Sequence, residues 1–166
     1  MGEREALIKD LDGEYENLYG ILMSLSDADK TPPLLDAWSA KDILAHIAGW
    51  LREGARILEG LARGEPVMPE SLDEDVDARN ARFVEEWRDA SVGEVQTELH
   101  TAKNAFAGAM RALPEERFAE GEVARRIVYE ESIDHFTEHA RQIWKWKERE
   151  RVGREVPPGM PREAIG

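Results

Sequence analysis

The chain has 166 residues, of which 42% are hydrophobic and 34% are charged, a balance typical of one globular domain rather than of a disordered segment. Acidic residues outnumber basic ones by 35 to 22, so the net charge of −13 should repel phosphate backbones and anionic lipids, and we expect neither nucleic acid nor a membrane as a partner. Cysteine is absent, which excludes disulfides, thiolate metal sites and a cysteine nucleophile within the chain.

The N-terminal residues bear on localisation. They are charged from Glu3 onward and contain no apolar segment of the kind found in a secretory signal. No apolar run approaches the roughly 20 residues that crossing a bilayer requires. We therefore expect a cytoplasmic protein.

Apolar residues recur at three- and four-residue spacing along most of the chain, which predicts an all-α fold. The first helix is predicted over about residues 3–25. A loop follows at 26–38, because the Pro-Pro pair within it cannot continue a helix. Ser39 and Asp42 form a capping-box pattern, which opens a second helix that runs to about Leu61.

A serine followed three residues later by glutamate predicts two more helix starts. Ser71 opens a shorter helix that runs to about Asp89, and Ser91 opens a longer one that ends near Leu113. The last helix is predicted over about residues 121–150, and the basic residues in its final turns suit the negative end of a helix dipole.

These elements predict an all-α fold, an up-and-down four-helix bundle with one additional shorter helix. Short connections between the predicted helices favour a single domain over residues 1–151. Residues 152–166 form a Pro- and Gly-rich tail after that domain.

The histidines are the candidate metal ligands. Counting about 100° per residue places His46 at one flank of the apolar stripe of the second helix, and places His135 and His139 between the buried and exposed sides of the last helix. Residues four apart on a helix have Cβ atoms about 5–6 Å apart, so the last two imidazoles can reach one ion. A third histidine from a facing helix would complete a three-nitrogen site with one open position, the layout of catalytic zinc. The alternative is three flank histidines that bond to backbone or water.

The stretch "HFTEH" (135–139) also matches H-x-x-E-H, a pattern of zinc peptidases in which the glutamate is the general base. Glu138, however, projects toward solvent, about 60° or more from the direction midway between the two histidines. Such a peptidase also needs a carboxylate ligand well downstream, and only 27 residues follow His139. Both observations disfavour the peptidase.

Other polar and aromatic residues are assigned roles from their positions. Trp38 and Trp50 can line a pocket over a metal, although packing in the core is the interpretation we favour. Asn80 lies within a predicted helix, where we expect a surface or inter-helix hydrogen bond. His100 points away from the apolar stripe of its helix and is expected to be solvated.

Three segments together resemble the DinB/YfiT-like superfamily of four-helix bundles: "WSAKDILAHIAGW" (38–50), "DARNARF" (77–83) and "HFTEHARQ" (135–142). The resemblance covers roughly residues 5–148. It implies that His46, His135 and His139 bind a divalent metal ion, with nickel or zinc ahead of iron or manganese. It also implies either a hydrolase, or a transferase or isomerase that uses a low-molecular-weight thiol such as mycothiol, bacillithiol or glutathione.

Two classes of function remain open. The first is a metal-dependent hydrolase or thiol-dependent S-transferase that acts on a small electrophilic molecule in stress or detoxification, with Glu53 and Glu130 as candidate general bases. The thiol would come from a cosubstrate, because the chain has no cysteine. The second is a non-catalytic bundle that binds a metal or a small molecule. We also expect a homodimer, because members of the superfamily often pair and the last helix carries aromatic residues near its end.

Overall fold

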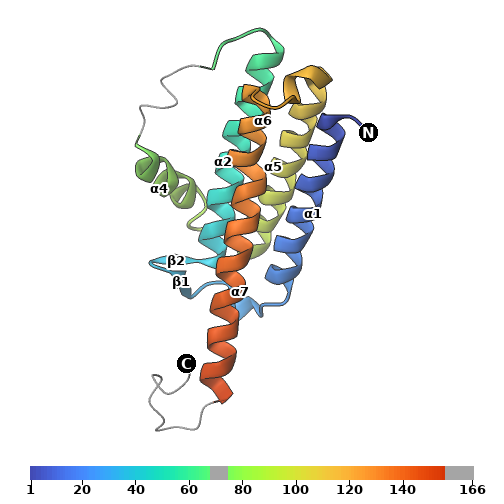
Figure 1. Ribbon diagram of the computed structural model, residues 1–166. Coiled ribbons are helices and arrows are strands. Elements are labelled where there is room, and N and C mark those ends of the chain that lie inside the picture. The colour runs from blue at the N-terminus through green and yellow to red at the C-terminus, as the bar shows by residue number, and fades with distance from the viewer. Residues whose placement is uncertain (68–74, 156–166) are drawn as a thin grey trace.

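The computed structural model describes residues 1–67 and 75–155, and within them the chain folds into an all-α bundle (Figure 1). The prediction of a helical bundle with one additional shorter helix is confirmed. The α-helices are α1 (Glu3–Met23), α2 (Ala40–Ala62), α4 (Val76–Glu86), α5 (Val92–Ala112), α6 (Val123–Val128) and α7 (Asp134–Glu155).

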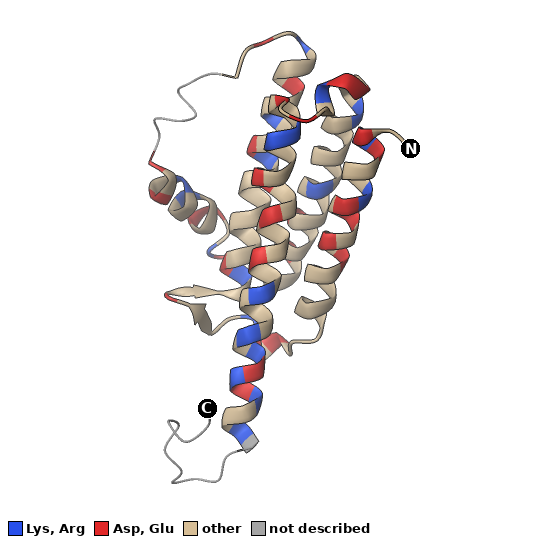
Figure 2. Ribbon diagram, viewed as in Figure 1, with Lys and Arg blue, Asp and Glu red and all other residues tan. Residues whose placement is uncertain are grey.

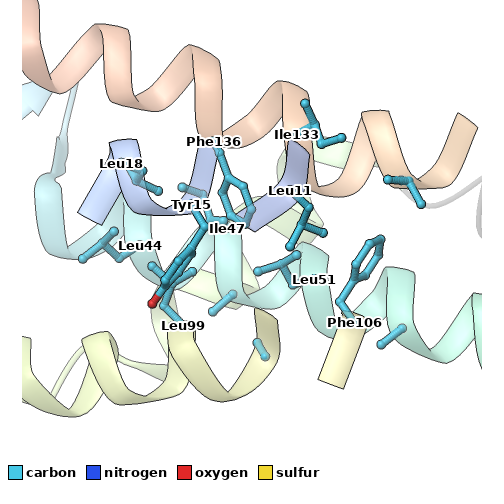
Figure 3. Close-up of a cluster of buried hydrophobic side chains, with 14 of the residues drawn as sticks. Leu11, Tyr15, Leu18, Leu44, Ile47, Leu51, Leu99, Phe106, Ile133 and Phe136 are labelled. Atoms are coloured by element: carbon cyan, nitrogen blue, oxygen red, sulfur yellow. The ribbon is translucent and has the colours of Figure 1, made fainter. Parts of the chain in front are cut away.

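Four rods form the bundle: α1, α2, α5 and the continuous run from α6 to α7 (Figure 1). Their apolar faces meet in a core whose side chains are almost fully buried, and Figure 3 shows part of it: Leu11, Leu18, Leu44, Ile47, Leu51, Leu99, Phe106 and Phe136. This burial is the main favourable term in folding, because apolar surface leaves water. It also fixes the separation of α2 from α7, the two helices that carry His46, His135 and His139.

Helices α2 and α5 run in the same direction. Lys41, at the start of α2, donates to the carbonyl of Arg88 just before α5. About three turns along α2 and two turns into α5, Arg52 pairs with Glu98 at 2.7 Å. The alternation of a simple up-and-down bundle is therefore interrupted here, because α4 carries the chain back along the outside of α2 (Figure 1).

The segment predicted as a loop before α2 is more ordered than expected. It contains a 3₁₀ turn, η1 (Asp27–Asp29), and an antiparallel hairpin of β1 (Pro33–Leu35) and β2 (Trp38–Ser39). The hairpin turns through Asp36, whose φ of 50° lies in the left-handed region that Asp tolerates better than most residues. The second strand leads directly into the predicted capping box, in which the Ser39 side chain accepts from the Asp42 amide.

Helix α4 packs across α2. Its predicted start at Ser71 lies outside the described residues, and the helix begins at Val76 with the side chain of Asp75 as its N-cap. Phe83 of α4 lies on Gly49 of α2, where a Cβ would approach the ring to 2.2 Å. The absence of a side chain at this glycine therefore lets the two helices come close together.

The last helix spans Val123–Glu155 and changes its winding once. Between α6 and α7 lies a π-helical turn, η3 (Tyr129–Ile133), and the chain between the two α-helices keeps helical dihedral angles there. Another 3₁₀ turn, η2 (Glu115–Phe118), precedes α6. Helix α7 continues to Glu155, past the expected domain boundary at 151, and its distal end extends beyond the bundle with bands of basic and acidic residues (Figure 2). The remainder of the predicted tail, residues 156–166, lies outside the described residues.

A helix that spans a membrane must be both long and apolar. Over residues 1–67 and 75–155, none of the helices is both long enough and apolar enough to cross a bilayer.

Candidate metal centre

The three predicted histidines come together between α2 and α7. The ring centre of His46 lies 5.2 Å from that of His135 and 5.2 Å from that of His139, and the last two are 5.8 Å apart. Three imidazoles bound to one tetrahedral ion through nitrogens about 2.0–2.1 Å away would have their ring centres about 5 Å apart. The observed spacing is therefore close to that of a three-histidine site.

The rings are near this arrangement but not yet in it. Within the described parts of the chain, no three His, Asp or Glu side chains are set to hold an ion as they stand. At least one ring therefore has to move before the three can share one ion. That His46, His135 and His139 bind a metal stays a prediction.

The hydrogen bonding of the cluster favours a ligand. His46 and His139 are only 5% and 7% exposed. The Nδ1 atoms of His46 and His135 are buried and have no hydrogen-bond partner among the described residues. Leaving a buried polar atom unpaired costs about 1–3 kcal/mol, so these two nitrogens are unusual in a stable core. A cation shared by the cluster fits this donor set, because it would take up nitrogen lone pairs that the protein leaves unused.

The electrostatics keep the cluster uncharged at neutral pH. Burial lowers the pKa of His46 to about 3, and electrostatic repulsion from His139 and His135 adds to this shift. Burial and the neighbouring His139 lower the pKa of His135 to about 4. The Glu131 carbonyl opposes this second shift, although its contact falls short of hydrogen-bond geometry. Burial also lowers the pKa of His139. Neutral imidazole is the form that binds metals, so all three rings are in the competent state at pH 7.

Two tryptophans border the cluster. The Trp38 ring, delivered by the hairpin, lies 5.0 Å from the His46 ring, and the Trp50 ring lies 6.3 Å from that of His135. Both indoles are half-buried: Trp38 packs against the edge of the core, and Trp50 packs edge-on against Phe83 of α4. They therefore combine the two roles that the sequence left open, since each packs on the bundle and also touches a histidine.

Asn80 fixes one of these indoles. The Nε1–H of Trp50 donates to Asn80 Oδ1 at 2.7 Å, which confirms the expected inter-helix hydrogen bond. Asn80 also acts on His46, whose pKa it raises against the larger effect of burial. Helix α4 is thereby tied to the side of α2 that carries His46. His100 is exposed on α5, as predicted.

The two candidate general bases are both engaged in ion pairs. Glu53 contacts Arg56 at 2.6 Å and Arg79 at 3.8 Å, and the hydrogen bond from Arg56 is the main cause of its lowered pKa. Glu130 is exposed and lies 3.9 Å from Arg126. Neither arrangement leaves the carboxylate as an obvious proton acceptor for a reaction at the histidines.

Glu131 was missed as a site residue. Burial, with smaller effects from Glu130 and Glu53, raises its pKa to about 7, so it can hold or release a proton near neutral pH. It lies in η3, one turn before His135, and faces Gly54 of α2. A Cβ placed on Gly54 would lie 3.1 Å from the Cβ of Glu131. The glycine on the facing helix was the one sequence signal available, and it becomes informative only once α2 and η3 are known to be neighbours.

Gln142 is the second residue that sequence reasoning left without a role. Its Oε1 lies 2.7 Å from Nδ1 of His139, one turn earlier on α7. It stands in the "HFTEHARQ" segment, and its three-residue spacing from His139 is the signal that could have identified it.

Comparisons with known proteins agree with this architecture. A family model described as the mycothiol maleylpyruvate isomerase N-terminal domain matches residues 11–126. An uncharacterised protein from Escherichia coli UTI89 has a similar structure, with 14% identity and a TM-score of 0.76 over 89% of this chain and 94% of that chain. The sibling lethal factor precursor DfsB is 20% identical, with a TM-score of 0.75 over 89% and 96% of the two chains. No curated protein matches the sequence.

A third similar structure corrects one expectation. The colibactin self-resistance protein ClbS, described in complex with dsDNA, has a TM-score of 0.75 and 14% identity over 87% of this chain and 94% of that chain. Our exclusion of nucleic acid as a partner is therefore wrong, because a protein with this fold is found on DNA. Net charge averages over a whole surface, whereas phosphate contacts depend on where individual cations lie.

The family model and the fold together place the protein. The match covers well over half of the sequence and includes His46, while the similar structures extend over the last helix as well. The chain belongs to the mycothiol maleylpyruvate isomerase N-terminal domain family, and it has the DinB/YfiT-like four-helix-bundle fold of that family.

Proposed function

We propose that the protein is a divalent-metal-dependent enzyme that acts on a small electrophilic molecule, with His46, His135 and His139 as the metal ligands. The observation that carries the proposal is the cluster of three neutral imidazoles with ring centres 5.2–5.8 Å apart, two of which have an unpartnered buried Nδ1. Three nitrogen donors suit nickel or zinc, with iron or manganese as further candidates.

The bound ion would act as a Lewis acid and would lower the pKa of a thiol or water placed at its open position. The surrounding residues prepare that position. Trp38 and Trp50 cover the histidines with apolar surface, which limits access of bulk water and strengthens the electrostatic interactions inside. Glu131, whose pKa is about 7, can exchange a proton with a reactant one helical turn from His135.

A thiol-dependent transfer or isomerisation is the favoured reaction class. The chain has no cysteine, so the attacking sulfur would come from a cosubstrate. The family description names a mycothiol maleylpyruvate isomerase, which supports a low-molecular-weight thiol over water as the nucleophile. Hydrolysis at the same ion, and a bundle that binds a metal without turnover, are the competing outcomes of the test.

The first experiment measures metal content in protein purified without a histidine tag and loaded separately with nickel, zinc, iron(II) and manganese. The wild type should hold about one ion per chain, and His46→Ala, His135→Ala and His139→Ala should each lose it. His100→Ala is the matched control, since this histidine is exposed on α5. Full metal occupancy in His46→Ala would contradict a site shared between α2 and α7.

A second experiment separates the enzyme from a binding protein. Loaded wild type is mixed with mycothiol, bacillithiol or glutathione and an activated aryl halide, and thiol consumption is followed. Metal-dependent turnover with one thiol supports the transferase. Turnover of an ester without any thiol would favour the hydrolase. Stoichiometric metal binding without turnover in either assay would favour the binding bundle.

A further inference from the structure

His139 differs from the other two histidines of the cluster in its hydrogen bonding. Its Nδ1 lies 2.7 Å from Oε1 of Gln142, whereas Nδ1 of His46 and of His135 have no such partner among the described residues. The contact joins positions three apart on α7, which lie on neighbouring lines of the helix surface. One imidazole of the three is therefore held by the protein before any ligand arrives.

The neighbouring carboxylate decides which way the Gln142 amide points. Nε2 of Gln142 lies 3.4 Å from Oε1 of Glu138, four residues earlier. An ionised carboxylate can only accept hydrogen bonds, so the amide nitrogen belongs on that side. Turning the amide over would place two acceptors opposite each other at Glu138. The amide oxygen is consequently directed at His139, and an amide oxygen can only accept.

The donor in that contact must then be His139 itself. A neutral imidazole carries its proton on one nitrogen and a lone pair on the other, and the partner of one nitrogen determines the state of both. With Nδ1 protonated toward Gln142, the lone pair is on Nε2.

We propose that Glu138 and Gln142 form a positioning pair that holds His139 in its Nδ1–H tautomer and so presents Nε2 as its ligand nitrogen. The use of Nε2 as a ligand rests on the proposed metal function, whereas the tautomer itself does not. The role also accounts for the glutamate in "HFTEH". Glu138 is exposed and acts through Gln142, as an orienting group and not as a general base.

Groups that orient a metal-binding histidine in this way typically raise metal affinity by about 10- to 100-fold. The benefit is entropic and electrostatic. The ring is already in one tautomer and one rotamer, and the accepted hydrogen bond makes the opposite nitrogen a better donor to a cation. His139 would thus be the ring that is ready first, and the two rings without Nδ1 partners would complete the site.

The test reads the tautomer directly in metal-free protein. Long-range ¹H–¹⁵N correlation spectra at pH 7.5 should show His139 with a protonated Nδ1 and an unprotonated Nε2. Gln142→Leu removes the acceptor at similar side-chain size and should give a mixture of tautomers. Gln142→Glu restores an acceptor and should restore the wild-type pattern. Gln96→Leu, on α5, is the matched control and should leave His139 unchanged.

Two results would overturn the proposal: an Nε2–H tautomer at His139 in the wild type, or an unchanged Nδ1–H tautomer in folded Gln142→Leu. Glu138→Leu tests the second member of the pair, because it frees the amide to turn and should also produce a mixture. An unaltered tautomer in that variant would remove Glu138 from the proposal.

Zinc affinity measured on the same variants keeps the two proposals distinguishable. Gln142→Leu should bind zinc about 10- to 100-fold more weakly than wild type, and Gln142→Glu should recover most of the loss. Wild-type protein that shows the expected tautomer but binds no metal would contradict the proposed function alone. Metal binding with the wrong tautomer would contradict the positioning pair alone.

Discussion

Gly49 of α2 lies directly beneath the ring of Phe83 of α4, and a Cβ on this glycine would be 2.2 Å from Cγ of the ring. We expect Gly49→Ala to push α4 away from α2 and to lower the free energy of unfolding by about 1–3 kcal/mol, the usual cost of overpacking. Urea unfolding measures this loss. Gly13→Ala on α1 is the control, because nothing lies within 4 Å of a Cβ there, and its effect should be neutral or stabilising.

The same pair can be tested for coupling. Adding Phe83→Leu to Gly49→Ala should recover part of the lost stability, because a smaller side chain leaves room for the methyl group. A double variant whose loss equals the sum of the two single losses would show that the clash at Phe83 is not the cause.

Acid should unfold the metal-free protein through its histidines. The pKa of His46 is about 3 and that of His135 about 4 in the folded state, against 6.5 for an exposed histidine, so the unfolded chain binds more protons between these values. The contribution of these two rings to stability is therefore complete above pH 6.5 and falls as the pH drops toward 4, by up to roughly 1.4 kcal/mol per pH unit for each ring. His46→Gln should flatten this slope in thermal melts between pH 7 and pH 4.5. An equally flat slope in His100→Gln would assign the effect to other groups.

Glu131 should act in the opposite direction. Its folded pKa of about 7 lies above the ordinary value of 4.5, so the native state binds the extra proton and stability falls as the pH rises from 4.5 through 7. Glu131→Gln removes this loss and should raise the melting temperature relative to wild type more at pH 8 than at pH 5. Glu130→Gln, at the exposed neighbour, should show a smaller pH-dependent gain, because it removes only one of the lesser contributions to the raised pKa of Glu131.

The two capping boxes provide a matched comparison of helix starts. Ser39 and Ser91 each accept from the amide three residues later, but Ser39 is buried and Ser91 is exposed. We expect each serine-to-alanine variant to cost about 1 kcal/mol. The cost at Ser39 should be the larger, because the Asp42 carboxylate loses the hydroxyl partner away from water. Urea unfolding of the two variants measures both losses of stability, and a larger loss at Ser91 would contradict the argument from burial.

Local sequence signals predicted most of the fold. The patterns at Ser39 and Ser91 located the starts of α2 and α5 to the residue, because a capping box satisfies backbone amides through contacts that lie within four residues. The convergence of His46 with His135 and His139 followed in the same way, since helical direction can be counted along the chain. The directions of these three side chains do not show which ligand the histidines bind.

The parts that sequence could not give depend on contacts between distant segments. The hairpin at 33–39 is too short to show strand alternation, and it forms against the end of the bundle. Glu131 and Glu130 are adjacent acids that look alike in sequence. The fold separates them, because one faces Gly54 of α2 and the other faces solvent beside Arg126. The raised pKa of Glu131 arises from its burial in that position.

The π-turn at Tyr129–Ile133 has a consequence for comparing chains of different length. Such a turn contains one residue more than the α-helical turn it replaces, so it absorbs an insertion without displacing the rest of the helix. A deletion of one residue inside it would restore regular α-winding and leave the downstream histidines in phase. The same deletion between His135 and His139 would rotate His139 by about 100° relative to His135. In an alignment, a one-residue gap at 129–133 would therefore mark a difference in backbone winding and not the loss of the site.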